Sequence, residues 1–273
     1  MNALRNHHLA CGARSEVGRC RADNQDSGYA GPQLALIADG VGGAPAGDLA
    51  SATIVRALVE LLGAPAARMT SQPRTALAAA NARLRTLTEG NPGLRGMATT
   101  LSGVVMNASQ SFIIHIGDSR VYRLRDGCLT QQTEDQTWVQ LLIAEGMLQP
   151  AAAHRHPMRN MLLHYLSGSA SDADAAYIAP IELRTGDRWL LATDGLSDYL
   201  PAPALASLVA CTADPQELAE TLIAECLDAS RDNISVVVAD VCDGPTGQFG
   251  ATEPTGRFIG AAETPLDDSA PAG

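Results

Sequence analysis

The sequence has 273 residues and a formal net charge of −11, from 19 basic and 30 acidic side chains. A hydrophobic fraction of 46% with few aromatic residues is typical of a packed globular core, and the length suits one large domain or two small ones. The acidic balance, with no basic stretch, argues against sequence-independent binding of nucleic acid. If an acidic protein of this kind binds a phosphorylated substrate, it needs positive charge at the binding site, and bound metal ions can supply that charge.

The cysteines and the N-terminus bear on cellular location. Six cysteines are scattered without a Cys-x-x-Cys pair, which is typical of a reducing compartment rather than of a disulfide framework. The N-terminus lacks an apolar core of signal-peptide length, and no segment has the length and hydropathy of a membrane span. We therefore expect a cytoplasmic protein that binds no membrane. We also expect a monomer.

The first half of the chain combines short strands with two long helices. Strands are predicted over 9–15, 27–30 and 34–38, the last because five consecutive apolar residues indicate a strand buried on both faces. Helices are predicted over 47–62, from apolar residues at helical spacing, and over 73–88, which is rich in alanine. Further strands are predicted over 98–106, 111–117, 121–125 and 128–132.

The second half begins with a short amphipathic helix at 137–145 and an irregular stretch at 146–176, which we interpret as a surface flap. Strands are then predicted at 177–183, 188–193 and 234–241, with helices near 203–210 and 215–228. Two consecutive long helices amid many strands favour an antiparallel α+β architecture over a doubly wound parallel sheet.

The last 31 residues differ in composition from the rest of the chain. Residues 243–273 are rich in glycine and proline, with few bulky apolar side chains. Such a composition cannot support a core of its own. We therefore expect one domain over 1–242 and a disordered tail over 243–273.

Three apolar strands end in an aspartate with a small residue beside it: Asp39, Asp118 and Asp194. A carboxylate at the end of a buried strand is costly unless a cation meets it. A single instance is better interpreted as a plain turn. Asp126-Gly127 is such a turn, because it lies between two short alternating runs. The threefold repetition points instead to a shared site.

Six aspartates are candidates for that site: Asp26, Asp39, Asp118, Asp194, Asp198 and Asp232. If several converge, cations or protons must offset their repulsion. Carboxylate sites without His or Cys suit Mg²⁺ or Mn²⁺ rather than zinc. Two such ions can share and deprotonate a bridging water and stabilise in-line displacement at phosphorus, and Arg21 offers paired donors for phosphate oxygens. Spacing alone does not establish that these residues converge.

Seven motifs resemble those of the metal-dependent protein phosphatases of the protein phosphatase 2C type, in their compact bacterial form. They occur in the family order and cover roughly residues 9–242. They are Gly-Arg-x-Arg-x-x-Asn-Gln-Asp at 18–26, Ala-Asp-Gly-x-Gly-Gly at 38–43, Met-Ala-Thr-Thr-Leu at 97–101, Ile-Gly-Asp-Ser-Arg-Val-Tyr at 116–122, His-Pro-x-x-Asn at 156–160, Ala-Thr-Asp-Gly-Leu-Ser-Asp at 192–198 and Arg-Asp-Asn-Ile-Ser at 231–235.

The resemblance implies a fold and an activity. The fold would be a sandwich of two antiparallel sheets flanked by helices, in agreement with the α+β architecture above. The activity would be hydrolysis of phosphoserine and phosphothreonine in a protein substrate, by direct attack of a hydroxide that bridges two Mn²⁺ or Mg²⁺ ions. Such an enzyme would oppose a bacterial serine/threonine kinase.

The resemblance also implies roles for the residues of the core metal site. Asp39 resembles the carboxylate that bridges both ions, with the carbonyl oxygen of Gly40 on one of them. Asp194 and Asp232 resemble direct ligands of the other ion. Asp26 matches a residue that holds metal-bound water.

Outside this core, the resemblance implies a third ion and a phosphate-binding residue. Asp118, together with Asp194 and Asp198, resembles the third-metal site of bacterial members. Arg21 matches the arginine that binds the phosphate group. Arg21, Asp39 and Asp194 are therefore the residues expected to act in catalysis.

Two other classes of function were weighed. A phosphatase with an aspartyl nucleophile needs a second aspartate two positions after the first, and after Asp39 this chain has Val41 there. A phosphatase with a cysteine nucleophile needs an arginine six residues after the cysteine, and none of the six cysteines has one. A catalytically silent regulatory binding module on the same fold would be expected to have lost metal carboxylates, and none of the central ones is missing. An active phosphatase is therefore the favoured interpretation, with the silent module as the alternative.

Overall fold

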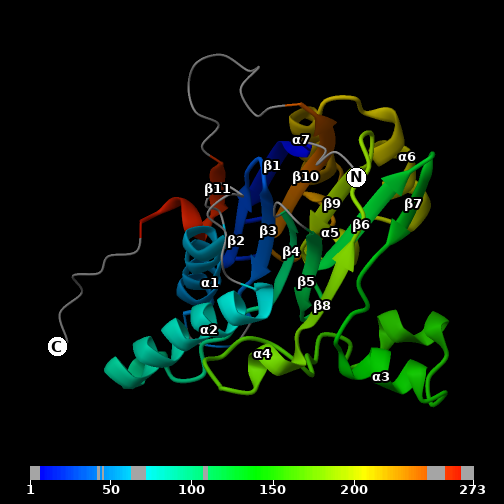
Figure 1. Ribbon diagram of the computed structural model, residues 1–273. Helices are drawn as coiled ribbons and strands as arrows, with labels where there is room; N and C mark the ends of the chain where they lie inside the picture. Colours follow the sequence, from blue (N-terminus) through cyan, green and yellow to red (C-terminus); the bar gives the residue numbers. More distant parts are fainter. Residues whose placement is uncertain are drawn as a thin grey trace.

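The computed structural model describes residues 7–41, 44, 46–62, 72–106, 110–244 and 256–265. Within them, two antiparallel sheets pack face to face, and helices cover the outer face of each (Figure 1). This α+β sandwich confirms the predicted fold class. None of the helices in these ranges combines the length and hydropathy needed to cross a bilayer.

The first sheet, sheet A, contains two paired strands of ten residues each at one side. Its strands, in spatial order, are β1 (His7–Glu16), β10 (Ile234–Asp243), β9 (Arg188–Ala192), β6 (Arg120–Arg125) and β7 (Cys128–Gln131). Alternate residues of β10 pack into two different hydrophobic clusters, one on each face of the sheet. Val236 and Val238 pack with the helices α6 (Ala202–Cys211) and α7 (Pro215–Cys226), whereas Val237 belongs to the layer between the sheets. The run of valines therefore reflects a strand covered on both faces.

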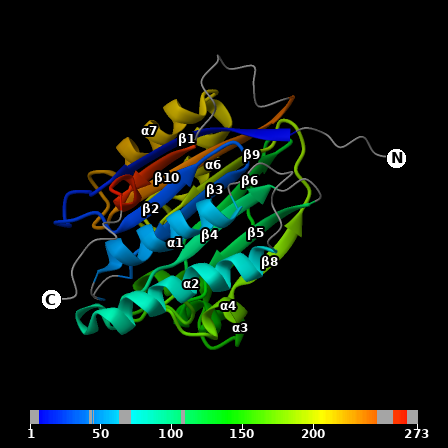
Figure 2. The same ribbon diagram turned by 60° about the vertical axis from the view of Figure 1, so that its left-hand side comes forward.

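The second sheet, sheet B, lies under the other helix layer, as Figure 2 shows. Its strands, in spatial order, are β11 (Arg257–Gly260), β2 (Asp26–Ala30), β3 (Leu34–Asp39), β4 (Leu101–Met106), β5 (Ser111–Ile116) and β8 (Tyr177–Ile181). The helices α1 (Gly47–Leu62) and α2 (Pro73–Gly90) cover it. Leu36 packs toward these helices and Ile37 toward sheet A, so β3 is buried on both faces as predicted.

The remaining elements are short. They are η2 (Pro92–Leu94), α3 (Trp138–Ala144), η3 (Pro150–Arg155), α4 (Asp172–Ala175), α5 (Asp194–Ser197) and η4 (Ala261–Glu263). The segment after α3, which belongs to the predicted flap at 146–176, projects from the sandwich in Figure 1 together with α3, which was predicted as a helix at 137–145. Asp126 and Gly127 have φ values of 52° and 75°, which confirms the ordinary hairpin turn between β6 and β7. The helix α5 was not predicted, because four residues carry no periodic signal.

The expectation of a disordered tail from residue 243 onward is wrong for the described segment 256–265. Strand β11 pairs with β2, and Ile259 is buried between the sheets. The ring of Phe258 packs against Tyr29 at a centroid distance of 5.1 Å. Composition alone missed this strand, because an edge strand can dock on an existing sheet with very few apolar side chains. Residues 245–255 and 266–273 of the expected tail lie outside the described ranges.

Candidate metal centre

Strands β3 and β9 end beside a cavity of about 180 Å³. Most of the predicted site residues line it, namely Arg21, Asp39, Gly40, Asp118, Asp194 and Asp232. A second cavity, of about 440 Å³, shares the walls formed by Asp118 and Asp194 and is also lined by Asp198. Sequence spacing could not establish that these residues converge, and the structure does bring them together. Gly42 and Gly43 of the second motif lie outside the described residues.

Asp39 is held through its backbone by the Met-Ala-Thr-Thr-Leu motif. The amide of Asp39 donates to Thr100 Oγ1 at 3.0 Å, and the hydroxyl of Thr99 donates to the Asp39 carbonyl at 2.8 Å. At Gly40 a Cβ atom would lie 2.6 Å from the backbone of Gly47, so only glycine allows the chain to pass this close to α1. These contacts fix the point at which the Asp39 carboxylate enters the cavity.

Asp194 is the first residue of α5, directly after β9. A Cβ atom on Gly195 would overlap the carbonyl oxygen of Asn233, so the loop that carries Asp232 packs directly against α5. The side chain of Asn233 donates to the carbonyl of Val17 at 2.9 Å. It also accepts from the amide of Gln25 at 2.9 Å and therefore ties the first motif to the last. Sequence reasoning gave Asn233 no role, since its partners lie more than 200 residues away.

Asp26 stands opposite Asp39 in the pairing of β2 with β3. It is 1% exposed, and its Oδ2 accepts a hydrogen bond from Thr193 Oγ1 at 3.0 Å. Its other oxygen, Oδ1, is buried and has no hydrogen-bond partner among the described residues, and the same holds for Asp194 Oδ1. Asp26 therefore lies behind the cavity wall, within reach of the carboxylate set but not on its surface.

The carboxylates raise one another's pKa values. Burial, together with the charge of Asp194, raises the pKa of Asp26 to about 7. Burial and the charges of Asp232 and Asp198 raise the pKa of Asp194 to about 7. Burial is also the largest cause that raises the pKa of Asp39 and of Asp118 well above the usual range. Such mutual repulsion is relieved by a cation.

The donor set fits hard divalent cations. It consists of carboxylate and carbonyl oxygens, and two of the buried carboxylate oxygens lack partners. No three His, Cys, Asp or Glu side chains in the described part of the chain are already gathered as a complete ligand group. Asp232 is instead engaged by Arg21 at 2.7 Å. Mg²⁺ in particular retains several waters and needs only one or two carboxylates, so the site residues suit an ion of this class.

Arg21 lies at the rim of the cavity, with 40% of its side chain exposed. Its Nη2 donates to Asp232 Oδ2, and this hydrogen bond raises the pKa of the guanidinium group. The residue expected to bind phosphate therefore lines the cavity and is paired there with a carboxylate. This pairing was not predicted.

Asp198 follows α5 on the side of the second cavity. Its Oδ1 lies 3.8 Å from Arg120 Nη2, and burial raises the pKa of its carboxyl group. Of the three residues expected to share a third ion, Asp198 is the most exposed, at 39% of its side chain. Asp118, Asp194 and Asp198 all line this cavity.

Comparisons with known proteins agree with this arrangement. The sequence model of the family described as Protein phosphatase 2C matches residues 15–228. The serine/threonine protein phosphatase PstP of Mycobacterium tuberculosis is 40% identical over 242 residues, which cover 88% of this chain and 46% of PstP. The chain thus spans about half the length of this relative. The serine/threonine phosphatase stp of Listeria monocytogenes is 30% identical, with 83% of this chain and 94% of stp covered.

Solved structures give the same result. A crystal structure of M. tuberculosis PstP has a TM-score of 0.77 and 38% identity, and covers 85% of this chain and 98% of its own. A structure described as the PstP catalytic domain in complex with two manganese ions has a TM-score of 0.78 and 38% identity, over 87% of this chain and all of its own. The motifs, the fold and these matches agree, and the chain therefore belongs to the metal-dependent protein phosphatase family of the protein phosphatase 2C type.

Proposed function

We propose that this chain is a protein serine/threonine phosphatase that requires Mn²⁺ or Mg²⁺. The observation that carries the proposal is the convergence of Asp39, Asp118, Asp194 and Asp232 on one cavity with Arg21 at its rim. The raised pKa values of the buried members support a cation site, since protons or metal ions must offset their charge. The manganese ions described for the PstP catalytic domain support the same choice of metal.

The roles proposed for the site residues follow from their positions around the cavity. Asp39, the Gly40 carbonyl, Asp194 and Asp232 would hold two ions, while Asp26 would hold water beside them. When bound, the ions would supply Lewis acidity toward the phosphate oxygens and toward water. Arg21 would exchange its contact with Asp232 for two oxygens of the substrate phosphate, which its planar fork matches. A water molecule would then attack phosphorus directly, as the P–O bond to the serine or threonine oxygen breaks. One proton of that water would end on the leaving oxygen, and no enzyme residue would be phosphorylated.

A third ion is proposed on the side of the second cavity. Asp118, Asp194 and Asp198 would share it, because all three line that cavity. We also propose that the enzyme acts in the cytoplasm as a monomer, on phosphoproteins made by a serine/threonine kinase. The folded domain proposed for this function includes residues 256–265 in addition to the range expected from sequence.

The proposal is tested by phosphate release from a phosphothreonine peptide at saturating Mn²⁺. Asp194→Ala is expected to lower turnover by at least about a hundredfold, the scale on which loss of one preorganised electrostatic group acts. Asp126→Asn is the matched control, because Asp126 is also followed by glycine but lies in the hairpin turn between β6 and β7. Equal turnover in the two variants would contradict the proposal and favour the silent binding module.

A further inference from the structure

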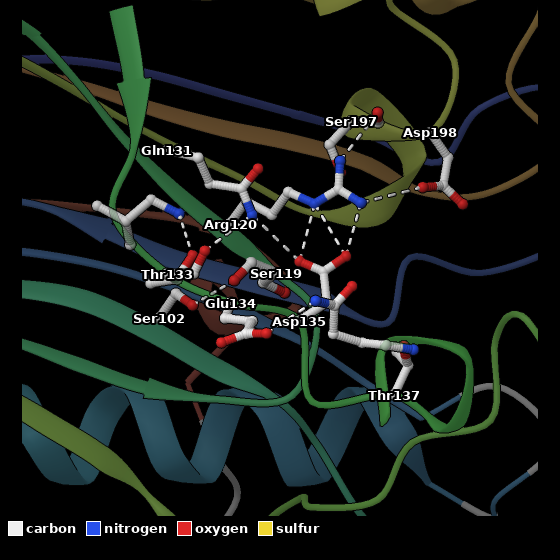
Figure 3. Close-up of polar contacts among 12 residues, drawn as sticks. Ser102, Ser119, Arg120, Gln131, Thr133, Glu134, Asp135, Thr137, Ser197 and Asp198 are labelled. Carbon is white, nitrogen blue, oxygen red and sulfur yellow. Dashed lines mark hydrogen bonds and ion pairs between the residues drawn. The ribbon is translucent and has the colours of Figure 1, made fainter. Parts of the chain in front are cut away.

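The second cavity borders a partly buried arginine, Arg120, that the proposed mechanism does not use. Figure 3 shows Arg120 at the centre of the contacts between Asp135, Ser197 and Asp198. Its Nε donates to Asp135 Oδ1 at 2.9 Å, and its Nη2 donates to Asp135 Oδ2 at 2.6 Å. Its Nη1 donates to the carbonyl of Ser197 at 3.3 Å, in the last turn of α5. One guanidinium group therefore joins β6, α5 and the segment after β7.

The segment after β7 runs along the turn that carries Asp118 and is hydrogen-bonded to it repeatedly. The amide of Gln132 donates to the Val121 carbonyl at 2.7 Å, and the amide of Val121 donates to Thr133 Oγ1 at 3.1 Å. Gln136 donates from its amide to the Gly117 carbonyl at 2.8 Å and accepts the Gly117 amide on Oε1 at 3.1 Å. The Arg120–Asp135 ion pair lies between these two sets of bonds along the chain.

The same segment is the root of the projecting part of the chain, residues 138–163, which takes in α3 together with residues 146–163 of the predicted flap and is called the flap from here on. The amide of Trp138 donates to the Met161 carbonyl, and the amide of Leu163 donates to the Gln136 carbonyl, each at 2.8 Å. The two ends of the flap are therefore fastened together at the segment that Asp135 anchors. Within the flap, Asn160 lines both cavities, so the flap's placement bears on the candidate metal centre.

We propose that Arg120 is a positioning residue that acts through its fork with Asp135, by which we mean the two parallel hydrogen bonds from Nε and Nη2 to the carboxylate. The fork orients the guanidinium group so that its Nη1 reaches the Ser197 carbonyl, and this contact holds the Asp118 turn against the end of α5 and thereby sets the separation of Asp118 from Asp198. It also sets where the flap root lies. The affinity of the weakest-bound divalent ion then depends on an arginine that never contacts that ion. This inference rests on the proposed function, because it concerns the third ion.

The planar fork and not the charge is the essential feature. A lysine at this position would keep a positive charge near Asp198, but it could not form two parallel hydrogen bonds to Asp135 and a third to the Ser197 carbonyl. Partners in the shell behind metal ligands typically change metal affinity or activity about 10–100-fold when they are replaced. The conservative variant Arg120→Lys therefore separates orientation from charge.

The chain offers a matched control at the other end of the same strand. Arg125 forms an equivalent fork with Asp187, with Nε and Nη2 donating at 2.6 Å each to the two carboxylate oxygens. Neither residue lines either of the two cavities at the candidate metal centre. Arg125→Lys thus removes the same kind of ion pair without touching the Asp118 turn.

The test is calorimetric titration of the chelated protein with Mn²⁺, followed by turnover of a phosphopeptide at limiting and at high Mn²⁺. For Arg120→Lys and Asp135→Asn we expect the weakest-bound ion to bind about tenfold less tightly or worse, with the tighter ions unchanged. Turnover should be reduced at limiting Mn²⁺ and recover as Mn²⁺ is raised. Arg125→Lys should titrate like the wild type.

Three outcomes would overturn the inference. If Arg120→Lys bound Mn²⁺ like the wild type, the positive charge alone would be sufficient. If Arg125→Lys lost the same affinity for the weakest-bound ion, the effect would be one of general stability. Reduced turnover that high Mn²⁺ does not restore would place Arg120 in a different role. If Arg120→Lys does not fold, Asp135→Asn decides between these outcomes, since it keeps the arginine. A wild type that binds no Mn²⁺ at all would instead refute the proposed function.

Discussion

Strand β11 leads to a prediction about stability that the glycine- and proline-rich composition of the C-terminal segment would not suggest. Ile259 is 2% exposed, and it lies over Gly28, where a Cβ atom would come within 2.8 Å of Ile259 Cγ1. Ile259→Ala removes three buried carbons, which at about 0.8 kcal/mol each, plus a residual cavity, lowers the free energy of unfolding by about 2–3 kcal/mol. For a domain of this size the corresponding fall in Tm is about 4–12 °C.

The assay is thermal and urea unfolding followed by circular dichroism. Glu263→Ala is the control, because Glu263 is exposed in the same segment and its replacement should change stability by less than about 0.5 kcal/mol. A chain that ends at Gly244 should lose at least as much stability as Ile259→Ala, while its turnover of a small phosphoester at low temperature is retained, since the proposed catalytic groups all precede residue 233. An unchanged Tm in the shortened chain would refute the docking of β11.

Three further predictions concern the candidate metal centre. Asp118→Asn should leave the two tighter ions bound while turnover falls about a hundredfold; near-normal turnover with two tight sites would mean that Asp118 only shapes its turn. Arg21→Ala should raise KM for a phosphopeptide without weakening Mn²⁺ binding in calorimetry, because its loss frees Asp232 from the ion pair; lost metal affinity with an unchanged KM would contradict this. Burial and neighbouring charges raise the pKa values of Asp26 and Asp194 to about 7, so the chelated folded state binds protons more tightly than the unfolded state, whose carboxyl pKa is about 4. The Tm of chelated protein should therefore fall as pH rises from about 4 to about 7, and saturating Mn²⁺ should reduce that fall; parallel profiles with and without Mn²⁺ would argue against a shared cation site.

Much of the fold could be predicted because hydrophobic periodicity reports burial directly. The five apolar residues before Asp39 indicated a strand covered on both faces, and residues 234–241 indicated a strand; both strands are present, as β3 and β10. The predicted ends of strands were less accurate where contacts of a single residue determine where the strand begins. Strand β4 begins at Leu101 rather than at residue 98, since Thr99 bridges to Gly40 and Leu166 instead of continuing the ladder.

The assembly of the site could not be derived from the sequence by physical reasoning alone. Asp26 meets Asp39 through a strand register, and Arg21 meets Asp232 across 211 residues of chain. Neither contact leaves a periodic signal, and the list of site residues came from the family motifs. The Arg120–Asp135 fork was missed for a related reason, because Asp135 lies in a loop and resembles any exposed turn residue until its partner is known.

The central claim is that this cavity hydrolyses phosphothreonine only when divalent ions occupy it. The most direct measurement is phosphate release from a phosphothreonine peptide by exhaustively chelated protein, before and after Mn²⁺ is added back. We predict no turnover above background in the chelated protein and full recovery with Mn²⁺, since Arg21, the cation that contacts Asp232, can bind phosphate oxygens but cannot activate water as a divalent ion would. Undiminished turnover after chelation would contradict the account.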